Sequence, residues 1–330
     1  MTNFFFSAIS LLTGKIIMKK VQTVYEHIRS NNIKTAVLVM LFPLFFIGLV
    51  FLFVWAVVPL NQAVDTTISV AIPTFIVCAI WMLISWAFGD SMILNVAGAQ
   101  EIQPGDPEHR EIFRTVENVA LAAGLPTPRV YIIEDNSLNA FATGRTPRDA
   151  SVALTRGIIK KLEKQELAGV IAHEMAHIGN RDIRLDMLII TGVGVTAFIA
   201  DIILRNAMYG NHSTTDDDNR GNSAAILMMV WLAFAVFNII ITPLLRMAVS
   251  RNREYAADST GAFITRNPHA LANALRKISA DSRVESMDNT KSLAAICIAN
   301  PGRPREFVSE LMATHPPIDK RIKKLKSMSV

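Results

Sequence analysis

Two long runs near the N-terminus contain no charged residue. The first covers Thr35 to Leu60 and the second covers Thr67 to Phe88, with Trp86 placed for the membrane interface. About twenty apolar helical residues cross the hydrocarbon core of a bilayer, and backbone groups in lipid must be paired within their own helix. We therefore expect a transmembrane hairpin at 35–88, turning at Asn61–Asp65. The alternative, two core helices of a soluble protein, fits poorly with the unbroken absence of charge.

A second pair of apolar stretches follows further along the chain. Met187 to Leu204 is marginal in length and carries Asp201, whereas Ala224 to Leu245 is uncharged and long enough to span. We expect a second apolar hairpin at 187–245. A shallow hairpin that lies partly in the protein remains the alternative.

The composition outside these runs is that of a soluble domain. Over the whole chain, hydrophobic residues make up 51% and charged residues 18%. Charged residues are about a quarter of ordinary soluble proteins, so these values indicate a membrane protein with one soluble domain. Residues 107–123 have helical spacing, 130–133 read as a strand, and 138–144 with 150–155 read as a β-hairpin. The chain thus divides into an N-terminal leader or interfacial segment (1–34), the first hairpin (35–88), a soluble part (89–186), the second hairpin (187–245) and a second soluble part (246–330).

The basic residues flank the apolar runs. Lys19, Lys20, Arg29 and Lys34 precede the first run, whereas the link at 205–222 contains three consecutive aspartates. This asymmetry places both termini and the soluble parts in the cytoplasm. The net charge of +5 is explained by anionic lipid, so we expect a bilayer partner and no nucleic acid. The oligomeric state is not predicted.

The soluble part contains the sequence HEMAH, which begins at His173 and ends at His177. Helical positions four apart lie on one face, so both imidazoles can bind one metal ion, and Glu174 lies close enough to take a proton from a water there. The flanking residues are small or apolar, which predicts a helix buried on most sides. Gly179 and Asn180 predict that the helix ends or loosens there. Buried imidazole and carboxyl groups need partners, and zinc would supply one.

A catalytic zinc has three protein ligands and one open position. Outside the motif, the candidates are several carboxylates and the histidines His109, His212, His269 and His315. Glu254 is favoured, because its helix follows the fourth apolar run while the motif helix leads into the third. If those runs are antiparallel neighbours, the ligands meet near the membrane surface. The alternative is an exposed helix on which Glu254 pairs with Arg251 or Arg253.

The motifs together resemble the HtpX-type membrane-bound zinc metalloproteases, gluzincins related to the CAAX prenyl proteases. The resemblance runs from Asn32 to the C-terminus and rests on HEMAH, the paired apolar runs, SRNREYAAD and THPPIDKRI. It implies a mainly α integral membrane protein, with transmembrane helices and a cytosolic α+β zincin-type protease domain that contains a small β-sheet. It also implies a multi-pass protein of the bacterial inner membrane, with its active site facing the cytoplasm.

The resemblance also implies roles for particular residues. The zinc ligands would be His173, His177 and Glu254, with one Zn²⁺ per chain, and Glu174 would be the catalytic carboxylate. Asp258 would hydrogen-bond a ligand histidine, and His315 would help to hold the oxyanion. Asn139, Ala140 and Phe141 would lie where an extended substrate binds. From the residues alone, Asn139 is equally well a turn residue and His315 a helix-start residue.

The expected reaction is hydrolysis of peptide bonds in unfolded or misfolded membrane proteins, which the family links to quality control and stress. Two other functions remain open. One is a non-catalytic, zinc-stabilised membrane adaptor, which would have no use for Glu174. The other is a zinc hydrolase that acts on prenylated or lipid-linked substrates, for which the chain has few apolar runs.

Overall fold

The computed structural model describes residues 24–57, 60–209, 251–280 and 316–328. Its elements, in chain order, are α2 (Val24–Val57), α3 (Leu60–Val96), β1 (Ala99–Glu101), α4 (Arg110–Ala123), β2 (Arg129–Ile133), β3 (Ala140–Thr143), β4 (Ser151–Thr155), α5 (Arg156–Lys161), α6 (Lys164–Gly179), α7 (Asp182–Tyr209), α10 (Arg251–Thr265), α11 (Pro268–Ala280) and α13 (Ile318–Lys326). The described part is mostly helical with one small mixed sheet, as the sequence predicts. The fourth apolar run lies outside the described residues.

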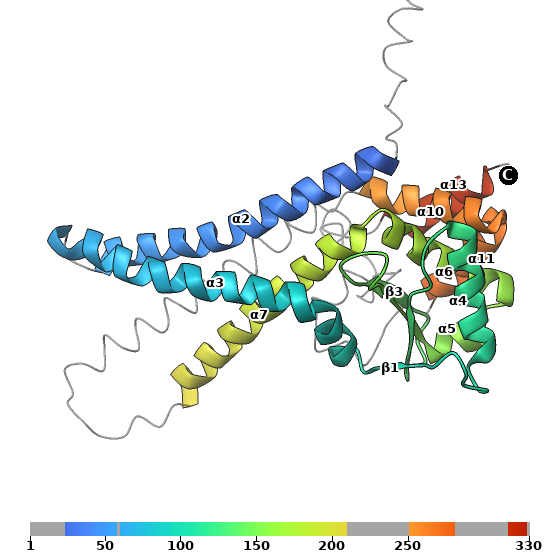
Figure 1. Cartoon of the computed structure of the whole chain (residues 1–330), viewed down its shortest axis with the longest axis horizontal. Coiled ribbons are helices and arrows are strands. Elements are labelled where there is room, and N and C mark those ends of the chain that lie inside the picture. Colours follow the sequence, from blue (N-terminus) through green and yellow to red (C-terminus); the bar gives the residue numbers. More distant parts are fainter. Residues whose placement is uncertain (1–23, 58–59, 210–250, 281–315, 329–330) are drawn as a thin grey trace, which may run out of the picture.

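Helices α2 and α3 lie side by side and project from the rest of the molecule (Figure 1). Both are long and apolar enough to cross a membrane, over Ile28–Gly48 and Asn61–Val96. Large apolar side chains on them are exposed, as lipid-facing helices require. The predicted turn at Asn61–Asp65 is wrong, because these residues are already part of α3. Polar side chains such as these are compatible with a helix, so they do not by themselves mark a turn.

The sheet has the strand order β1-β2-β4-β3. Strands β3 and β4 pair antiparallel with Ala140 opposite Leu154, which confirms the predicted hairpin. Strand β2 pairs parallel with β4, and β1 pairs antiparallel with β2. Among the described strands, β3 has a neighbour on one side only, so it is an edge strand of the sheet.

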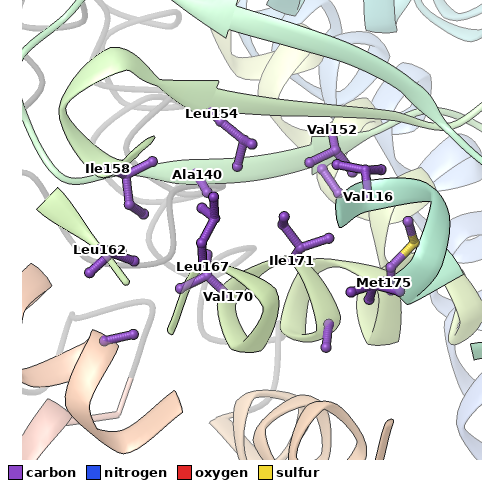
Figure 2. Close-up of a cluster of buried hydrophobic side chains, with 14 of the residues drawn as sticks. Val116, Ala140, Val152, Leu154, Ile158, Leu162, Leu167, Val170, Ile171 and Met175 are labelled. Atoms are coloured by element: carbon purple, nitrogen blue, oxygen red, sulfur yellow. The ribbon is translucent and has the colours of Figure 1, made fainter. Parts of the chain in front are cut away.

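The two faces of the sheet pack on different layers. Ala140, Val152 and Leu154 point toward α6, where they meet Val170 and Ile171 (Figure 2). Alternate positions, such as Phe141 and Ala153, belong to a second cluster with α3 and the start of α7. This alternation is the two-residue period of a strand. The sheet therefore lies between the motif helix and the base of the candidate membrane helices.

Helix α6 is buried on most sides, as predicted. The Glu166 carboxylate accepts a hydrogen bond from the Glu163 N–H at 2.9 Å at its start, and the Asn180 N–H donates to the Ala176 carbonyl at its end. Helix α10 packs closely on α6, and a Cβ at Gly261 would stand 3.0 Å from the backbone nitrogen of His173. The glycine therefore permits the approach that brings the two helices together at the site.

Candidate metal centre

Helices α6 and α10 bring His173, His177 and Glu254 together. The two imidazoles lie one turn apart on α6, with 3.2 Å between their Nε2 atoms. Glu254 Oε2 lies 3.7 Å from His173 Nε2, and Glu254 Oε1 lies 3.5 Å from His177 Nε2. One ligand atom from each residue can be chosen so that all lie within 4.8 Å of one another. Glu254 is 4% exposed, so the exposed helix considered as the alternative is not observed.

These distances fit a divalent metal ion. Ligands about 2.0–2.1 Å from a tetrahedral zinc lie about 3.3 Å from each other, close to the separations found here. Two imidazoles and a carboxylate are also the donor set of a catalytic zinc with one position left for water or substrate. The residues therefore fit the metal that the sequence predicts.

Each imidazole is held from its other nitrogen by a carboxylate. Asp258 Oδ1 lies 3.0 Å from Nδ1 of His173, and Asp182 Oδ2 lies 2.8 Å from Nδ1 of His177. Both Nε2 atoms consequently face the shared position, the arrangement that orients metal-binding histidines. The sequence predicts this contact for Asp258 but not for Asp182. A signal was available, since Asp182 begins the next helix five residues after His177.

Arg321 on α13 is a second residue that the sequence analysis missed. Its side chain is fully buried, its Nη2 lies 2.7 Å from Asp258 Oδ1, and its Nη1 lies 3.4 Å from Glu254 Oε2. The guanidinium thus balances two carboxylates of the site. Its position could have been read from helical spacing, because Arg321 lies on the same face as Ile318 and the buried Leu325.

Arg253 joins the site to the candidate membrane helices. Its Nη2 lies 3.0 Å from Asp186, and its Nη1 lies 3.4 Å from Asp182, both on α7. Asn31 of α2 also donates a hydrogen bond to Asp182. The neighbouring Arg253 and Glu254 therefore point to different partners, and a buried ionic cluster connects α2, α7 and α10.

Glu174 is 2% exposed and has the environment of a proton carrier. Burial raises the pKa of its carboxyl to about 7, assisted by the charge of Glu254 and opposed by His177, Arg321 and a backbone hydrogen bond from Ala142 of β3. A carboxyl with a pKa near neutrality suits general acid–base catalysis.

The pKa values of the two histidines are shifted in opposite directions. Burial, assisted by the charge of Arg321, lowers the pKa of His173. Burial also disfavours charge on His177, but its hydrogen bond with Asp182 and the charges of Glu254 and Glu174 outweigh this and raise its pKa to about 9. Metal binding must therefore release a proton from His177, since only neutral imidazole is a ligand.

The residues expected to bind substrate lie on or beside β3. Asn139 is buried, its Oδ1 accepts a hydrogen bond from the Ala140 N–H at 2.9 Å, and its N–H donates to Thr155 Oγ1 at 3.0 Å. Phe141 is packed in the cluster with α3 and α7. These side chains fix the strand in the sheet. His315 and His212 lie outside the described residues.

A buried H-E-x-x-H helix beside a small sheet, carried on helices able to cross a bilayer, is the combination of a membrane metalloprotease. The profile of peptidase family M48 matches residues 107–329, and the chain belongs to this family. It is therefore a hydrolase acting on peptide bonds, a membrane metallopeptidase that depends on a metal ion.

The relatives extend the match to most of the chain. A protein named Protease HtpX homolog from Thermoanaerobacter pseudethanolicus is 39% identical over 310 residues, which cover 94% of this chain and 99% of the relative. A Protease HtpX homolog from Bacteroides fragilis is 35% identical, with 88% and 94% covered. The crystal structure of S. mikatae Ste24p aligns with a TM-score of 0.46 and 16% identity, covering 84% of this chain and 62% of that one. The resemblance to HtpX-type proteases expected from the motifs is thus confirmed.

Proposed function

We propose that the chain is a zinc-dependent endopeptidase of the bacterial inner membrane that cleaves unfolded or misfolded membrane proteins on the cytoplasmic side. The observation that carries this proposal is the cluster of His173, His177 and Glu254 with Glu174 beside it, within hydrogen-bonding range of the β3 edge. A role in quality control under stress, which the resemblance to HtpX-type proteases implies, is part of this proposal.

His173, His177 and Glu254 would hold one zinc ion. Bound there, zinc would polarise the scissile carbonyl and make a water nucleophilic near neutral pH. Glu174 takes the proton of that water on its carboxylate and later delivers it to the leaving amine nitrogen. Asp258 and Asp182 keep the imidazoles oriented, and we assign His315 to the oxyanion.

The substrate would bind as an extended strand along β3. Backbone groups on an open sheet edge can pair with a peptide of any sequence, which suits a protease that degrades many unfolded proteins. Asn139, Ala140 and Phe141 would keep this edge in register. Because Ala142 of β3 donates a backbone hydrogen bond to Glu174, the edge and the proton carrier are already coupled.

Glu174→Gln tests the mechanism. The variant should retain one equivalent of zinc and lose at least about 10²-fold in cleavage of an unfolded membrane protein, because general base catalysis typically contributes that much. Glu163→Gln is the matched control, since Glu163 is an exposed carboxylate at the start of the same helix. Full activity in Glu174→Gln would refute the mechanism, and loss of zinc would show a structural effect instead.

We also propose that the chain crosses the membrane four times, with the metal centre in the cytoplasm. The proposal follows from the distribution of basic residues and the two apolar hairpins. It is tested with single cysteines at Ser213 and Ser327, with Cys78 and Cys297 replaced by serine. An impermeant maleimide applied to spheroplasts should label position 213 and leave position 327 unlabelled. Labelling at 327 would contradict the orientation, and labelling at neither would favour a shallow second hairpin.

A further inference from the structure

An apolar cavity of about 820 Å³ lies between α2, α3 and α7, and the mechanism does not use it. Its walls include Met40 and Leu44 of α2, Phe75 and Leu83 of α3, and Leu188 of α7. Met40 and Leu83 are each 68% exposed, although both lie on helices that are apolar enough to enter lipid. Their exposure leaves a groove that suits an apolar occupant.

A charged side chain contacts Trp86, one of the residues that line this groove. Trp86 lines the cavity, and the guanidinium carbon of Arg184 lies 5.2 Å from the centre of its ring. Arg184 also donates to the Arg145 carbonyl at 2.8 Å and to Asn32 Oδ1 at 3.4 Å. Contacts from three segments therefore fix one guanidinium beside Trp86 of the apolar groove. Arg184 lies one helical turn from Leu188, so the charge and the cavity wall are adjacent.

The charge of Arg184 is not balanced by an ion pair. Within the described residues, no carboxylate lies within ion-pair distance of Arg184 or Arg181, and the nearby Asp149 pairs instead with Arg145 Nε at 2.7 Å. Burial and the charge of Arg181 lower the pKa of the Arg184 guanidinium. An anion bound here would relieve this repulsion, and the guanidinium geometry matches phosphate and carboxylate groups.

The length of the groove identifies the apolar partner. Phe75 and Trp86 are about 16 Å apart along α3 at about 1.5 Å per residue, which is about half of the ~30 Å hydrocarbon core of a bilayer. A transmembrane segment of a substrate would need the full thickness, whereas one acyl chain occupies one leaflet. Tryptophan and arginine at the end of the groove match the headgroup level.

We propose that this groove is a binding site for an anionic glycerophospholipid, whose phosphate contacts Arg184 and one of whose acyl chains lies in the cavity beside Trp86. The site rests on the insertion of α2 and α3 in the bilayer, which is part of the proposed topology, and is independent of the proposed chemistry.

The test uses the full chain with Trp86 as its only tryptophan, inserted in phosphatidylcholine vesicles. Phosphatidylglycerol with brominated acyl chains, added at a low mole fraction, should quench Trp86 fluorescence more strongly than brominated phosphatidylcholine at the same fraction. Arg184→Gln should weaken the apparent affinity for phosphatidylglycerol about tenfold, as expected for a lost charge-assisted hydrogen bond. Arg110→Gln, the same change at an exposed arginine of α4, is the matched control.

Filling the groove separates a site from simple attraction to the surface. Ala79 lines the cavity, so Ala79→Phe should reduce quenching of Trp86 by phosphatidylglycerol severalfold. Equal quenching by both lipids, no effect of Arg184→Gln, or no effect of Ala79→Phe would each overturn the proposal. Absence of quenching by either lipid would also overturn it, because protein would then cover the groove.

Two further arms separate this proposal from the others. A variant with Trp55 of α2 as its only tryptophan should be quenched by both lipids if the hairpin enters the bilayer. No quenching at Trp55 would overturn the topology and, with it, the lipid site. Quenching at Trp55 without lipid-selective quenching at Trp86 would overturn the lipid site alone. Introducing Glu174→Gln should leave the quenching of Trp86 unchanged, so failure of the catalytic mechanism does not affect this readout.

Discussion

At the scale of single residues, the metal centre depends on the carboxylates behind its histidines. Asp182 accepts a hydrogen bond from His177 at 2.8 Å and also contacts Arg253 and Asn31. Without this acceptor the imidazole would lose its fixed orientation. Asp182→Asn should therefore reduce zinc affinity about 10–100-fold, measured by competition with a chromogenic chelator.

A matched control exists elsewhere in the chain. Asp106 makes the same kind of contact, with its Oδ2 2.6 Å from His109 Nδ1, away from the metal cluster. Asp106→Asn should leave zinc affinity unchanged. If both variants lose the same affinity, or neither does, the assigned role of Asp182 is wrong.

Arg321 offers a second prediction, on stability. Its replacement by methionine leaves the buried Asp258 without its strongest partner, at 2.7 Å. Removal of one member of a buried ion pair costs about 3–5 kcal/mol, so Arg321→Met should lower the free energy of unfolding by that order. Thermal unfolding in detergent measures it, with Lys320→Met, an exposed position of the same helix, as control. An unchanged midpoint would contradict the prediction.

The residues that the sequence predicted are those with chemistry of their own. The H-E-x-x-H spacing is local, so His173 and His177 follow from helical geometry. Glu254 follows from the need of zinc for a third ligand, and the structure places it beside the pair. The roles of Arg321 and Arg253 are not predicted, because the sequence alone does not distinguish a buried arginine from an exposed one. Only the carboxylates around it, which come from other helices, determine its burial.

At the scale of elements, the site requires α10 to approach α6 closely. Gly261 lies on the same face of α10 as Glu254, and its Cβ position is 3.0 Å from the His173 nitrogen. Backbone cannot move aside as a side chain can. Gly261→Val should therefore separate the helices, cost about 1–3 kcal/mol by overpacking, and lower zinc occupancy.

The control for this change is Gly194 in α7, where a Cβ meets no atom of the described residues within 4 Å. Gly194→Val should retain zinc and keep the unfolding midpoint close to that of the unmodified chain. Thermal unfolding and metal content are measured on both variants. Full zinc occupancy in Gly261→Val would show that the close approach is not needed.

Elements with strong local signals were predicted well, whereas their pairing was not. The helix at α4 ends where predicted, at Gly124, which adopts a left-handed φ of 66°. Strands β2, β3 and β4 were also expected. The parallel pairing of β2 with β4 and the addition of β1 were not, because pairing between distant strands leaves no periodic pattern in either one.

At the scale of the whole molecule, the metal centre joins segments that are far apart in the chain. The ligands come from α6 and α10, their supporting groups come from α7, α10 and α13, and Asn31 extends the cluster to α2. The sheet packs on α3 and α7 through its other face. The protease site and the candidate membrane helices are therefore one connected structure. Loss of the metal should lower the stability of this whole structure.

Removal of the metal tests this coupling. A ligand present at about 100 times its dissociation constant stabilises the folded state by about 2.7 kcal/mol. For a domain of 150–250 residues, this stabilisation raises the unfolding midpoint by about 5–10 °C. A chelator should lower the midpoint by this amount, and added Zn²⁺ should restore it. In Glu254→Gln the shift should shrink strongly, whereas Glu163→Gln should behave as the unmodified chain. An equal shift in Glu254→Gln would mean that the stabilising ion binds elsewhere, because a site that has lost its carboxylate ligand cannot retain the same linkage between metal binding and folding.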